Sequence, residues 1–195
     1  MNRGTDNKLW LAEVNAERLY ADRRIEVYRK VYHAWDGKIL EPYYSLKLGD
    51  YVVIVATDID GNYICVHQFR QGIQCVTTEF PAGGIDSKAV NGSYMPETLL
   101  ENAKRELREE TGYISDKWTH VFTVPANATL ADNYAYIFLA EDCEKKSEQC
   151  LDETEYLEVE LYSSDQLDSL MRSGGFQHAV HMLALYLAKE KRARK

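Results

Sequence analysis

Short runs of apolar residues, many of them β-branched, recur along the chain and predict a protein rich in β-strands. The clearest run is Tyr-Val-Val-Ile-Val-Ala at residues 51–56. The turn sequence DIDGN at residues 58–62 separates it from a second run, so the two predict a hairpin. The full set of predicted strands covers residues 24–35, 51–56, 63–69, 76–80, 118–124, 134–140 and 156–162.

Helices are predicted in the middle and at the end of the chain. Pro96–Thr111 has the composition of a helix, with Pro96 suited to its first turn and Gly112 to its end. A short helix is predicted to begin at Ser164, and a final helix over residues 176–191. Strands come first, one helix interrupts them and helices follow. This order is typical of an α+β fold with a mixed or antiparallel sheet.

The N-terminal part is predicted to be an extension, residues 1–48, in front of a domain that covers residues 49–195. Within the extension, residues 8–20 carry a weak helical periodicity, and residues 24–35 partly alternate as a strand does. Asp36-Gly37 then indicates a turn. A length of 195 residues is enough for one well-buried domain.

Composition and charge restrict the classes of partner. Hydrophobic residues make up 45% and charged residues 28% of the chain, as in ordinary soluble globular proteins. The net charge of -8 disfavours broad attachment to nucleic acid. No apolar run reaches membrane-spanning length, and the opening stretch MNRGTDNK lacks the apolar core of a signal peptide. We therefore expect neither nucleic acid nor membrane as a partner.

The cysteines and histidines show no spacing typical of a metal site. Cys65 lies in an apolar run and is interpreted as a core residue. A disulfide between Cys143 and Cys150 is an alternative, although reduced thiols and a cytoplasmic location are favoured. His178 and His181, in the last predicted helix, are interpreted as structural.

Three glutamates at the end of the predicted central helix carry the strongest chemical signal. Glu106 lies three residues before Glu109 and four before Glu110, so their carboxylates can share one helix face. Acidic groups near a helix C-terminus are unfavourable, because the macrodipole is also negative there. A hard cation with oxygen ligands would resolve this conflict, and Mg²⁺ fits best, with Mn²⁺ as the alternative. An acidic face that is merely solvated is the competing interpretation.

The sequence around these glutamates resembles the Nudix box, G-x5-E-x7-R-E-U-x-E-E-x-G-U, in which U is a bulky apolar residue. Its later positions match in register, as Glu97, Arg105-Glu106-Leu107, Glu109-Glu110 and Gly112-Tyr113. The first glycine of the box is best taken as Gly83. Thirteen residues then separate Gly83 from Glu97 where the box has five, so the loop carries an eight-residue insertion, roughly residues 87–94.

The flanks of the box resemble one branch of the family, the ADP-ribose and ADP-sugar pyrophosphatases. Gln68-Phe69-Arg70 resembles the Q-[YF]-R strand end of that branch. Residues 79–83, Glu-Phe-Pro-Ala-Gly, resemble its E-[LF]-P-A-G turn. The resemblance covers roughly residues 50–190. It implies a Nudix fold, an α/β/α sandwich built on a mixed sheet.

The resemblance also implies roles for individual residues. The three glutamates of the helix correspond to metal ligands and catalytic groups, with the carbonyl of Ala82 as a further ligand. Arg105 is included in the catalytic set, because it would orient the glutamates by pairing with Glu109 or Glu97. The candidate substrate contacts are Arg70, Glu79, Gly83 and Trp35, and the residues that would maintain the motif itself are Glu97 and Gly112.

One departure from that branch concerns the catalytic base. A loop of that branch often reads S-P-G-[FL]-T-D-E, and Asn133 stands at the place of its glutamate. An asparagine cannot accept a proton as a carboxylate does. Three alternatives stay open: a glutamate of the box is the base, Asp132 substitutes for it, or the substrate differs from ADP-ribose.

The reaction that the resemblance implies is Mg²⁺-dependent hydrolysis of a nucleoside diphosphate linked to a small group. ADP-ribose or an ADP-sugar is the leading substrate, giving AMP and a sugar phosphate. The alternatives are a Nudix-fold sensor without turnover and a Nudix hydrolase of another nucleotide sugar or of a dinucleoside polyphosphate. A homodimer is also expected, with the N-terminal extension as a candidate contact. Trp35 is the best N-terminal aromatic for stacking on the base, ahead of Tyr43 and Tyr44.

Overall fold

The computed structural model describes residues 8–85 and 94–194, and the chain divides into two compact units. One unit comprises Met1–Gly49 and Pro125–Tyr134, and the other comprises Asp50–Val124 and Ala135–Lys195. The predicted loop insertion, residues 87–94, lies outside the described residues except for its last position. The predicted domain boundary between residues 48 and 49 stays a prediction.

Among the described residues, the larger unit is built on an eight-stranded mixed sheet. Five strands follow the order β11-β5-β4-β10-β8, while β6 pairs with β5, β7 with β4 and β9 with β10. Neighbouring β4 and β10 run parallel, whereas β5 is antiparallel to β4, β6 and β11. The strands are β4 (Tyr51–Asp58), β5 (Tyr63–Arg70), β6 (Cys75–Glu79), β7 (Ala82–Gly84), β8 (Tyr113–Ile114), β9 (Lys117–Pro125), β10 (Tyr134–Lys145) and β11 (Leu157–Tyr162).

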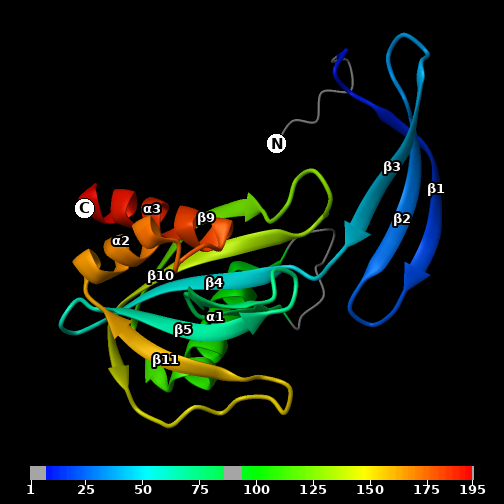
Figure 1. Ribbon diagram of the computed structural model, residues 1–195. Helices are drawn as coiled ribbons and strands as arrows, with labels where there is room; N and C mark the ends of the chain where they lie inside the picture. Colours follow the sequence, from blue (N-terminus) through cyan, green and yellow to red (C-terminus); the bar gives the residue numbers. More distant parts are fainter. Residues whose placement is uncertain (1–7, 86–93, 195) are drawn as a thin grey trace. The chain divides into compact units, whose positions relative to one another are not determined.

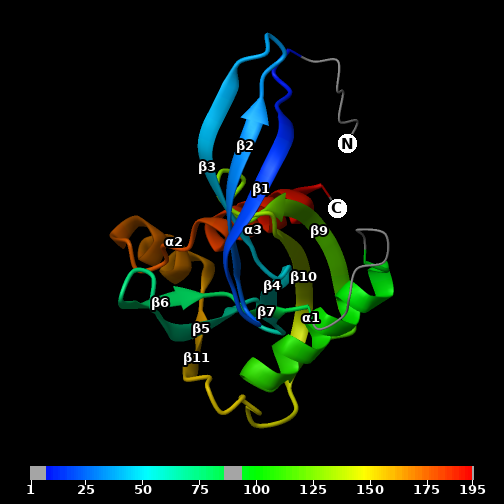
Figure 2. The ribbon, with the colours of Figure 1, turned by 90° about the vertical axis from the view of Figure 1, so that its right-hand side faces the viewer.

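Helices cover both faces of this sheet, as Figure 1 and Figure 2 show. Alternate residues of β4 point to opposite faces. Val52 and Ile54 join the core beneath α1, and Val53 and Val55 join the core beneath α2 and α3. The predicted α/β/α sandwich on a mixed sheet is therefore confirmed. The helices are α1 (Pro96–Thr111), α2 (Ser164–Ser173) and α3 (Ala179–Ala193).

α1 has the bounds that the sequence predicted, because each end carries a residue suited to it. Pro96 stands in the first turn, where its missing N–H is not needed. Gly112 ends the helix in the left-handed conformation, with φ 75°, and its N–H donates to the carbonyl of Arg108. A β-carbon on Gly112 would lie 2.0 Å from the carbonyl oxygen of Ser147, so the position also needs glycine for space.

The smaller unit contains, within the described part of the chain, a three-stranded antiparallel sheet in the order β1-β2-β3. These strands are β1 (Ala12–Ala21), β2 (Glu26–His33) and β3 (Ile39–Lys47). The strand predicted within residues 24–35 is confirmed as β2. Leu46 of β3 forms a bridge with Ala131, which joins the sheet to the segment Pro125–Tyr134.

The helix predicted from residues 8–20 is wrong, because most of these residues form β1. Their helical periodicity is weak, whereas pairing with β2 satisfies backbone hydrogen bonds along the strand. Ion pairs between the two strands add to the pairing, with Glu13 2.8 Å from Lys30 and Arg18 3.3 Å from Glu26. The pairing of β1 with β2 therefore outweighs the weak helical periodicity of this segment.

The cysteines and the helices bear on two further expectations. Cys65 is fully buried in the core, as predicted, and the thiols of Cys143 and Cys150 are free. In the part of the chain that the structure describes, no helix is both long enough and apolar enough to cross a membrane.

Candidate active site

The glycine turn and the central helix come together beside β4. The first half of β4 pairs with β7, Tyr51 opposite Gly84 and Val53 opposite Ala82, while its second half pairs with β5. Between these halves, the N–H of Ile54 donates to the carbonyl of Pro81 at 2.9 Å. α1 packs against both β4 and β7. The sheet therefore holds the turn at residues 81–84 next to the helix that carries the glutamates.

Glu106 lies directly against this turn. Its side chain is on the inner face of α1 and the residue is 7% exposed. The atoms nearest to a β-carbon built on Gly83 are the carboxylate atoms of Glu106, so the missing side chain of Gly83 leaves the space that this carboxylate occupies. The predicted contact of Gly83 with substrate stays a prediction.

Glu110 occupies the next turn of α1 and is more deeply buried, at 3% exposed. Its Oε2 accepts a hydrogen bond from the N–H of Ala82 at 3.0 Å. Burial raises the pKa of Glu110 to about 8 despite that hydrogen bond, and the charges of Glu106 and Glu155 act in the same direction. Burial likewise raises the pKa of Glu106 to about 7. The metal-free site therefore retains protons near neutral pH.

Arg105 joins the glutamates of the box. Its Nη2 lies 2.8 Å from Oε1 of Glu106, and its Nη1 donates to Oε2 of Glu109 at 2.9 Å. Of the two partners considered from the sequence, Glu109 is paired with Arg105, whereas Glu97 lies exposed in the first turn of α1. The guanidinium of Arg105 therefore fixes two of the three carboxylates relative to each other.

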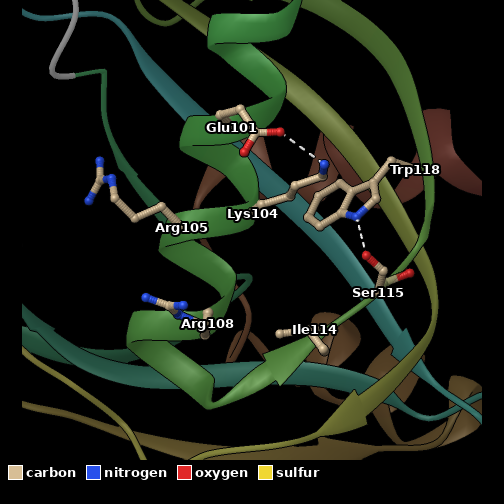
Figure 3. A pocket seen from close by; sticks show the side chains of 7 residues that line it. All are labelled: Glu101, Lys104, Arg105, Arg108, Ile114, Ser115 and Trp118. Carbon is tan, nitrogen blue, oxygen red and sulfur yellow. Dashed lines mark hydrogen bonds and ion pairs between the residues drawn. The ribbon is translucent and has the colours of Figure 1, made fainter.

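The outer side of α1 carries a separate depression of about 280 Å³, drawn in Figure 3. There Lys104 pairs with Glu101 at 2.9 Å, and the indole N–H of Trp118 donates to the carbonyl of Ser115. In Figure 3, Arg105 extends away from Lys104 and Trp118. Lys104 and Glu101 thus pair with each other on an exposed part of α1, whereas Glu106 and Glu110 are buried, which makes Lys104 and Glu101 suitable control positions.

Three of the glutamates of α1, namely Glu106, Glu109 and Glu110, fit a divalent cation. Glu106 and Glu110 are buried, Arg105 joins Glu106 to Glu109, and the charge of Glu106 contributes to the raised pKa of Glu110. Clustered carboxylates with raised pKa values exchange their protons for a hard cation, which prefers oxygen ligands. The assignment of these residues and of the Ala82 carbonyl as ligands stays a prediction.

A pocket of about 380 Å³ opens beside Glu110 and Ala82. Arg70, at the end of β5, lines it with a side chain that is 34% exposed. Nε of Arg70 donates to Oε1 of Glu79 at 2.8 Å, and its Nη2 donates to Oε2 at 2.5 Å. Glu79 is fully buried, so we expect it to affect the substrate through Arg70 and not by direct contact. The candidate phosphate contact therefore lies in the same pocket as a candidate metal ligand.

Glu155 is a pocket residue that the sequence reasoning missed. It lies in the loop before β11, lines the pocket with Tyr156, and its charge helps to raise the pKa of both Glu106 and Glu110. Its carboxylate is steadied by a hydrogen bond from the N–H of Asp152 at 3.1 Å. The acidic stretch Asp-Glu-Thr-Glu before β11 was the available signal, but no spacing linked it to the box.

Three residues considered from the sequence belong to the smaller unit. Asn133 is buried, and its Nδ2 donates to the carbonyl of Gly49, while Asp132 accepts a hydrogen bond from the N–H of Leu48. Trp35 is 63% exposed, and Nζ of Lys8 lies 4.6 Å from the centroid of its ring. The predicted role of Trp35 in substrate binding stays a prediction.

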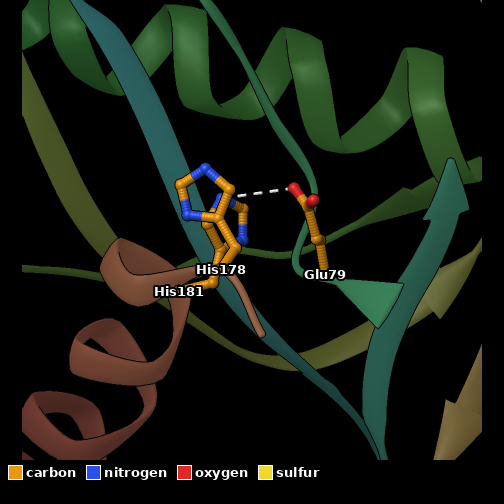
Figure 4. Close-up of side chains that lie close together, drawn as sticks. All are labelled: Glu79, His178 and His181. Atoms are coloured by element: carbon orange, nitrogen blue, oxygen red, sulfur yellow. Dashed lines mark ion pairs between the residues drawn. The ribbon is translucent and has the colours of Figure 1, made fainter. Parts of the chain in front are cut away.

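A second set of ionisable side chains lies next to Arg70. Glu79, His178 and His181 offer ligand-type atoms that all lie within 4.8 Å of one another. Figure 4 shows both imidazoles at the start of α3, facing Glu79 at the end of β6. No local spacing indicates this cluster, because about a hundred residues separate its two parts and only the fold brings them together.

Comparisons with known proteins agree with this geometry. The NUDIX domain model matches residues 47–185. The ADP-ribose pyrophosphatase of Bacillus subtilis is 32% identical over 146 residues, which cover 73% of each chain. An uncharacterized Nudix hydrolase of Schizosaccharomyces pombe is 36% identical over 132 residues, 63% of this chain and 60% of that protein.

A solved structure described as an ADP compounds hydrolase has a similar fold. The similarity has a TM-score of 0.76 and covers 92% of each chain, with 22% sequence identity. The match to the NUDIX domain model covers residues 47–185, which include α1, its glutamates and the glycine turn. The alignment with the Bacillus subtilis protein covers 73% of the chain and includes the same segments. The chain therefore belongs to the Nudix hydrolase family.

Proposed function

We propose that this protein hydrolyses the diphosphate of ADP-ribose or a related ADP-sugar, giving AMP and a sugar phosphate, with Mg²⁺ as its ion. The observation that carries the proposal is the pocket in which Arg70 lies beside Ala82 and Glu110. It is supported by the Bacillus subtilis relative, which is named an ADP-ribose pyrophosphatase, and by the similarity to an ADP compounds hydrolase.

Nudix hydrolases generally use a divalent metal, and in this chain Glu106, Glu109 and Glu110 would hold it, with the carbonyl of Ala82 as a further ligand. When bound, the ion supplies positive charge that offsets the negative charge of the diphosphate oxygens. Arg105 keeps Glu106 and Glu109 in register for this purpose.

Arg70 is proposed to bind the diphosphate directly. Its Nε and Nη2 are committed to Glu79, which leaves the edge formed by Nη1 and Nη2 with N–H groups to donate to phosphate oxygens. Trp35 is retained as a proposed stacking contact for the base.

Glu155 is proposed as the base for the attacking water, in place of the glutamate that Asn133 replaces in the sequence pattern. Water adds to one phosphorus, the bridging P–O bond breaks, and the proton of the water passes to a carboxylate. The position of Glu155 in the pocket and its electrostatic effect on Glu106 and Glu110 support this role.

The test is a substrate panel with Mg²⁺, analysed by chromatography of the nucleotide products. The panel contains ADP-ribose, an ADP-hexose, a UDP-sugar, a GDP-sugar and a diadenosine polyphosphate. We expect the two ADP-sugars to give AMP fastest. Fastest turnover of a UDP- or GDP-sugar would contradict adenine as the nucleobase of the substrate. Binding of ADP-ribose without any turnover would indicate a sensor.

We also propose that the protein acts as a homodimer in the cytoplasm, with residues 1–48 contributing to the contact. The family resemblance and the free thiols support these two points. Sedimentation velocity tests the dimer, and a monomer at micromolar concentration would contradict it.

A further inference from the structure

Glu79, His178 and His181 form a buried cluster behind the pocket, and its role depends on how its hydrogen bonds are arranged. Glu79 is fully buried and His181 is 1% exposed. His178 precedes the first residue of α3, and its Nδ1 is buried without a hydrogen-bond partner among the described residues. Two interpretations are open to such a cluster: a metal site, or a support for the neighbouring Arg70.

The hydrogen bond of Phe80 argues against a metal. The backbone N–H of Phe80 donates to Nδ1 of His181 at 3.1 Å, so Nδ1 is the unprotonated nitrogen. In the neutral ring the proton therefore lies on Nε2, which is the nitrogen that faces Glu79. A metal at Nε2 would have to displace that proton and leave an imidazolate, or break the bond to Phe80.

Burial also keeps this ring neutral, because it lowers the pKa of His181 to about 3. Nε2 of the ring, which carries the proton, lies 3.6 Å from Oε2 of Glu79, a close polar contact that is longer than a hydrogen bond. One side chain from α3 therefore contacts both the carboxylate of Glu79 and the backbone of the residue that follows it.

Glu79 in turn is committed to Arg70. Oε1 accepts from Nε of Arg70 and from the hydroxyl of Thr77, and Oε2 accepts from Nη2 of Arg70. Burial alone would raise the pKa of Glu79, but the hydrogen bonds from Arg70 and Thr77 hold this pKa below its usual value. The buried carboxylate thus remains an anion that fixes the plane of the guanidinium.

We propose that His181 is a positioning residue, which holds Glu79 so that Arg70 presents its remaining edge to the phosphate groups of the substrate. This rests on the proposed function only in taking Arg70 as a phosphate contact. When the imidazole is removed, Glu79 can turn and Arg70 loses its fixed orientation. Substrate binding must then fix the orientation of Arg70 again, so removal of the imidazole mainly raises KM.

Two substitutions separate the two contacts of the ring. In His181→Gln, the amide nitrogen can take the place of Nε2 and still donate toward Glu79, but the acceptor for Phe80 is lost. In His181→Asn, the amide oxygen can take the place of Nδ1 and accept from Phe80, but the donor toward Glu79 is lost. We expect His181→Asn to raise KM roughly tenfold or more, and His181→Gln to keep KM near the wild-type value.

A merely structural role gives a different result. Partial unfolding lowers the amount of active protein, so the apparent kcat falls in both variants while KM stays the same. If His181→Asn does not fold, Glu79→Gln tests the next contact of the same series, between Glu79 and Arg70, and a rise in KM is again expected. A wild-type KM in Glu79→Gln would then overturn the inference.

A double-mutant cycle tests whether the effect passes through Arg70. In an Arg70→Ala background, His181→Asn should cause no further rise in KM, because the side chain that it positions is gone. Equal effects of His181→Asn with and without Arg70 would overturn the inference.

The Nε–H signal of Arg70 in ¹⁵N NMR spectra provides a readout that does not depend on turnover. The signal is assigned by its loss in Arg70→Lys, and its hydrogen exchange is compared in wild type, His181→Gln and His181→Asn. We expect slow exchange in the first two and at least roughly tenfold faster exchange in the third. If the wild type turns over no substrate, the proposed function fails and this comparison still stands. Equal exchange in all three proteins would overturn the positioning role.

Discussion

Gly83 and Glu106 form one structural unit, although the chain brings them together from a turn and a helix. A β-carbon on Gly83 would lie 2.0 Å from Cδ of Glu106 and 2.1 Å from its Oε2. Gly83 is therefore needed here for the space that the carboxylate of Glu106 fills.

Replacement of Gly83 with alanine should impair activity while the protein stays folded. The new methyl group displaces the carboxylate of Glu106, a proposed metal ligand, and misplaced ligands cost roughly a hundredfold in rate. Steady-state kinetics with increasing Mg²⁺ measures the effect. Gly84→Ala is the matched control, because a β-carbon there meets no atom of residues 8–85 and 94–194 within 4 Å. Equal rates for the two variants would contradict the steric relation.

Substitution Glu110→Gln should weaken metal binding without loss of stability. The amide is neutral, as the protonated carboxyl is, and its oxygen can still accept from the N–H of Ala82. Mn²⁺ affinity, measured by electron paramagnetic resonance, should fall at least about tenfold, since even outer partners of metal ligands contribute that much. Glu101→Gln, on the outer side of α1, is the control. Undiminished Mn²⁺ binding in Glu110→Gln would remove this residue from the ligand set.

The thermal stability of the metal-free protein should fall as pH rises from 6 to 8.5. The pKa values of Glu106 and Glu110 are raised to about 7 and about 8 in the folded protein, so protonation of these groups favours folding. Their contribution is complete below the ordinary pKa of glutamate, near 4.5, and is lost as pH passes through the raised values.

Mg²⁺ should reverse this trend, because it binds the ionised carboxylates. Differential scanning fluorimetry at pH 6 and pH 8.5, with EDTA or with Mg²⁺, measures both effects. We expect the increase in Tm on adding Mg²⁺ to be larger at pH 8.5. Glu110→Gln should show a smaller pH dependence, and an increase in Tm that is the same at both pH values would contradict the proposed site.

Substitution Glu155→Gln should lower kcat without changing metal affinity. A general base contributes roughly 10²- to 10⁴-fold to the rate, and Glu155 lines the pocket without being one of the box glutamates. Single-turnover kinetics measures the chemical step, and Mn²⁺ titration measures the metal. Glu158→Gln, an exposed position in β11, is the control. A wild-type rate in Glu155→Gln would return the base role to a glutamate of the box or to Asp132.

Local signals were sufficient to predict much of the fold. The hairpin of β4 and β5 follows from a β-branched run and a turn at residues 58–62, and Gly61 in that turn has φ 84°. The ends of α1 follow from Pro96 and Gly112. In these segments the residues nearby in the chain and the packing favour the same structure.

Elements that depend on distant partners could not be predicted in this way. β7 and β8 have three and two residues, too few for any periodicity, and they are strands only because β4 and β10 lie beside them. Glu155 and His181 belong to no motif, and the roles proposed for them rest on the side chains that the fold brings to them. The spacing within the box could be recognised in the sequence, whereas the residues that pack around the box could not.

The most direct measurement follows hydrolysis of ADP-ribose by ³¹P NMR, with Mg²⁺ or with excess EDTA, for the wild type and for Glu110→Gln. We expect the diphosphate signals to be replaced by those of AMP and ribose 5-phosphate in the wild type with Mg²⁺ alone. Hydrolysis that continues at the same rate in EDTA, or in Glu110→Gln, would contradict a reaction that depends on a cation held by the glutamates of α1.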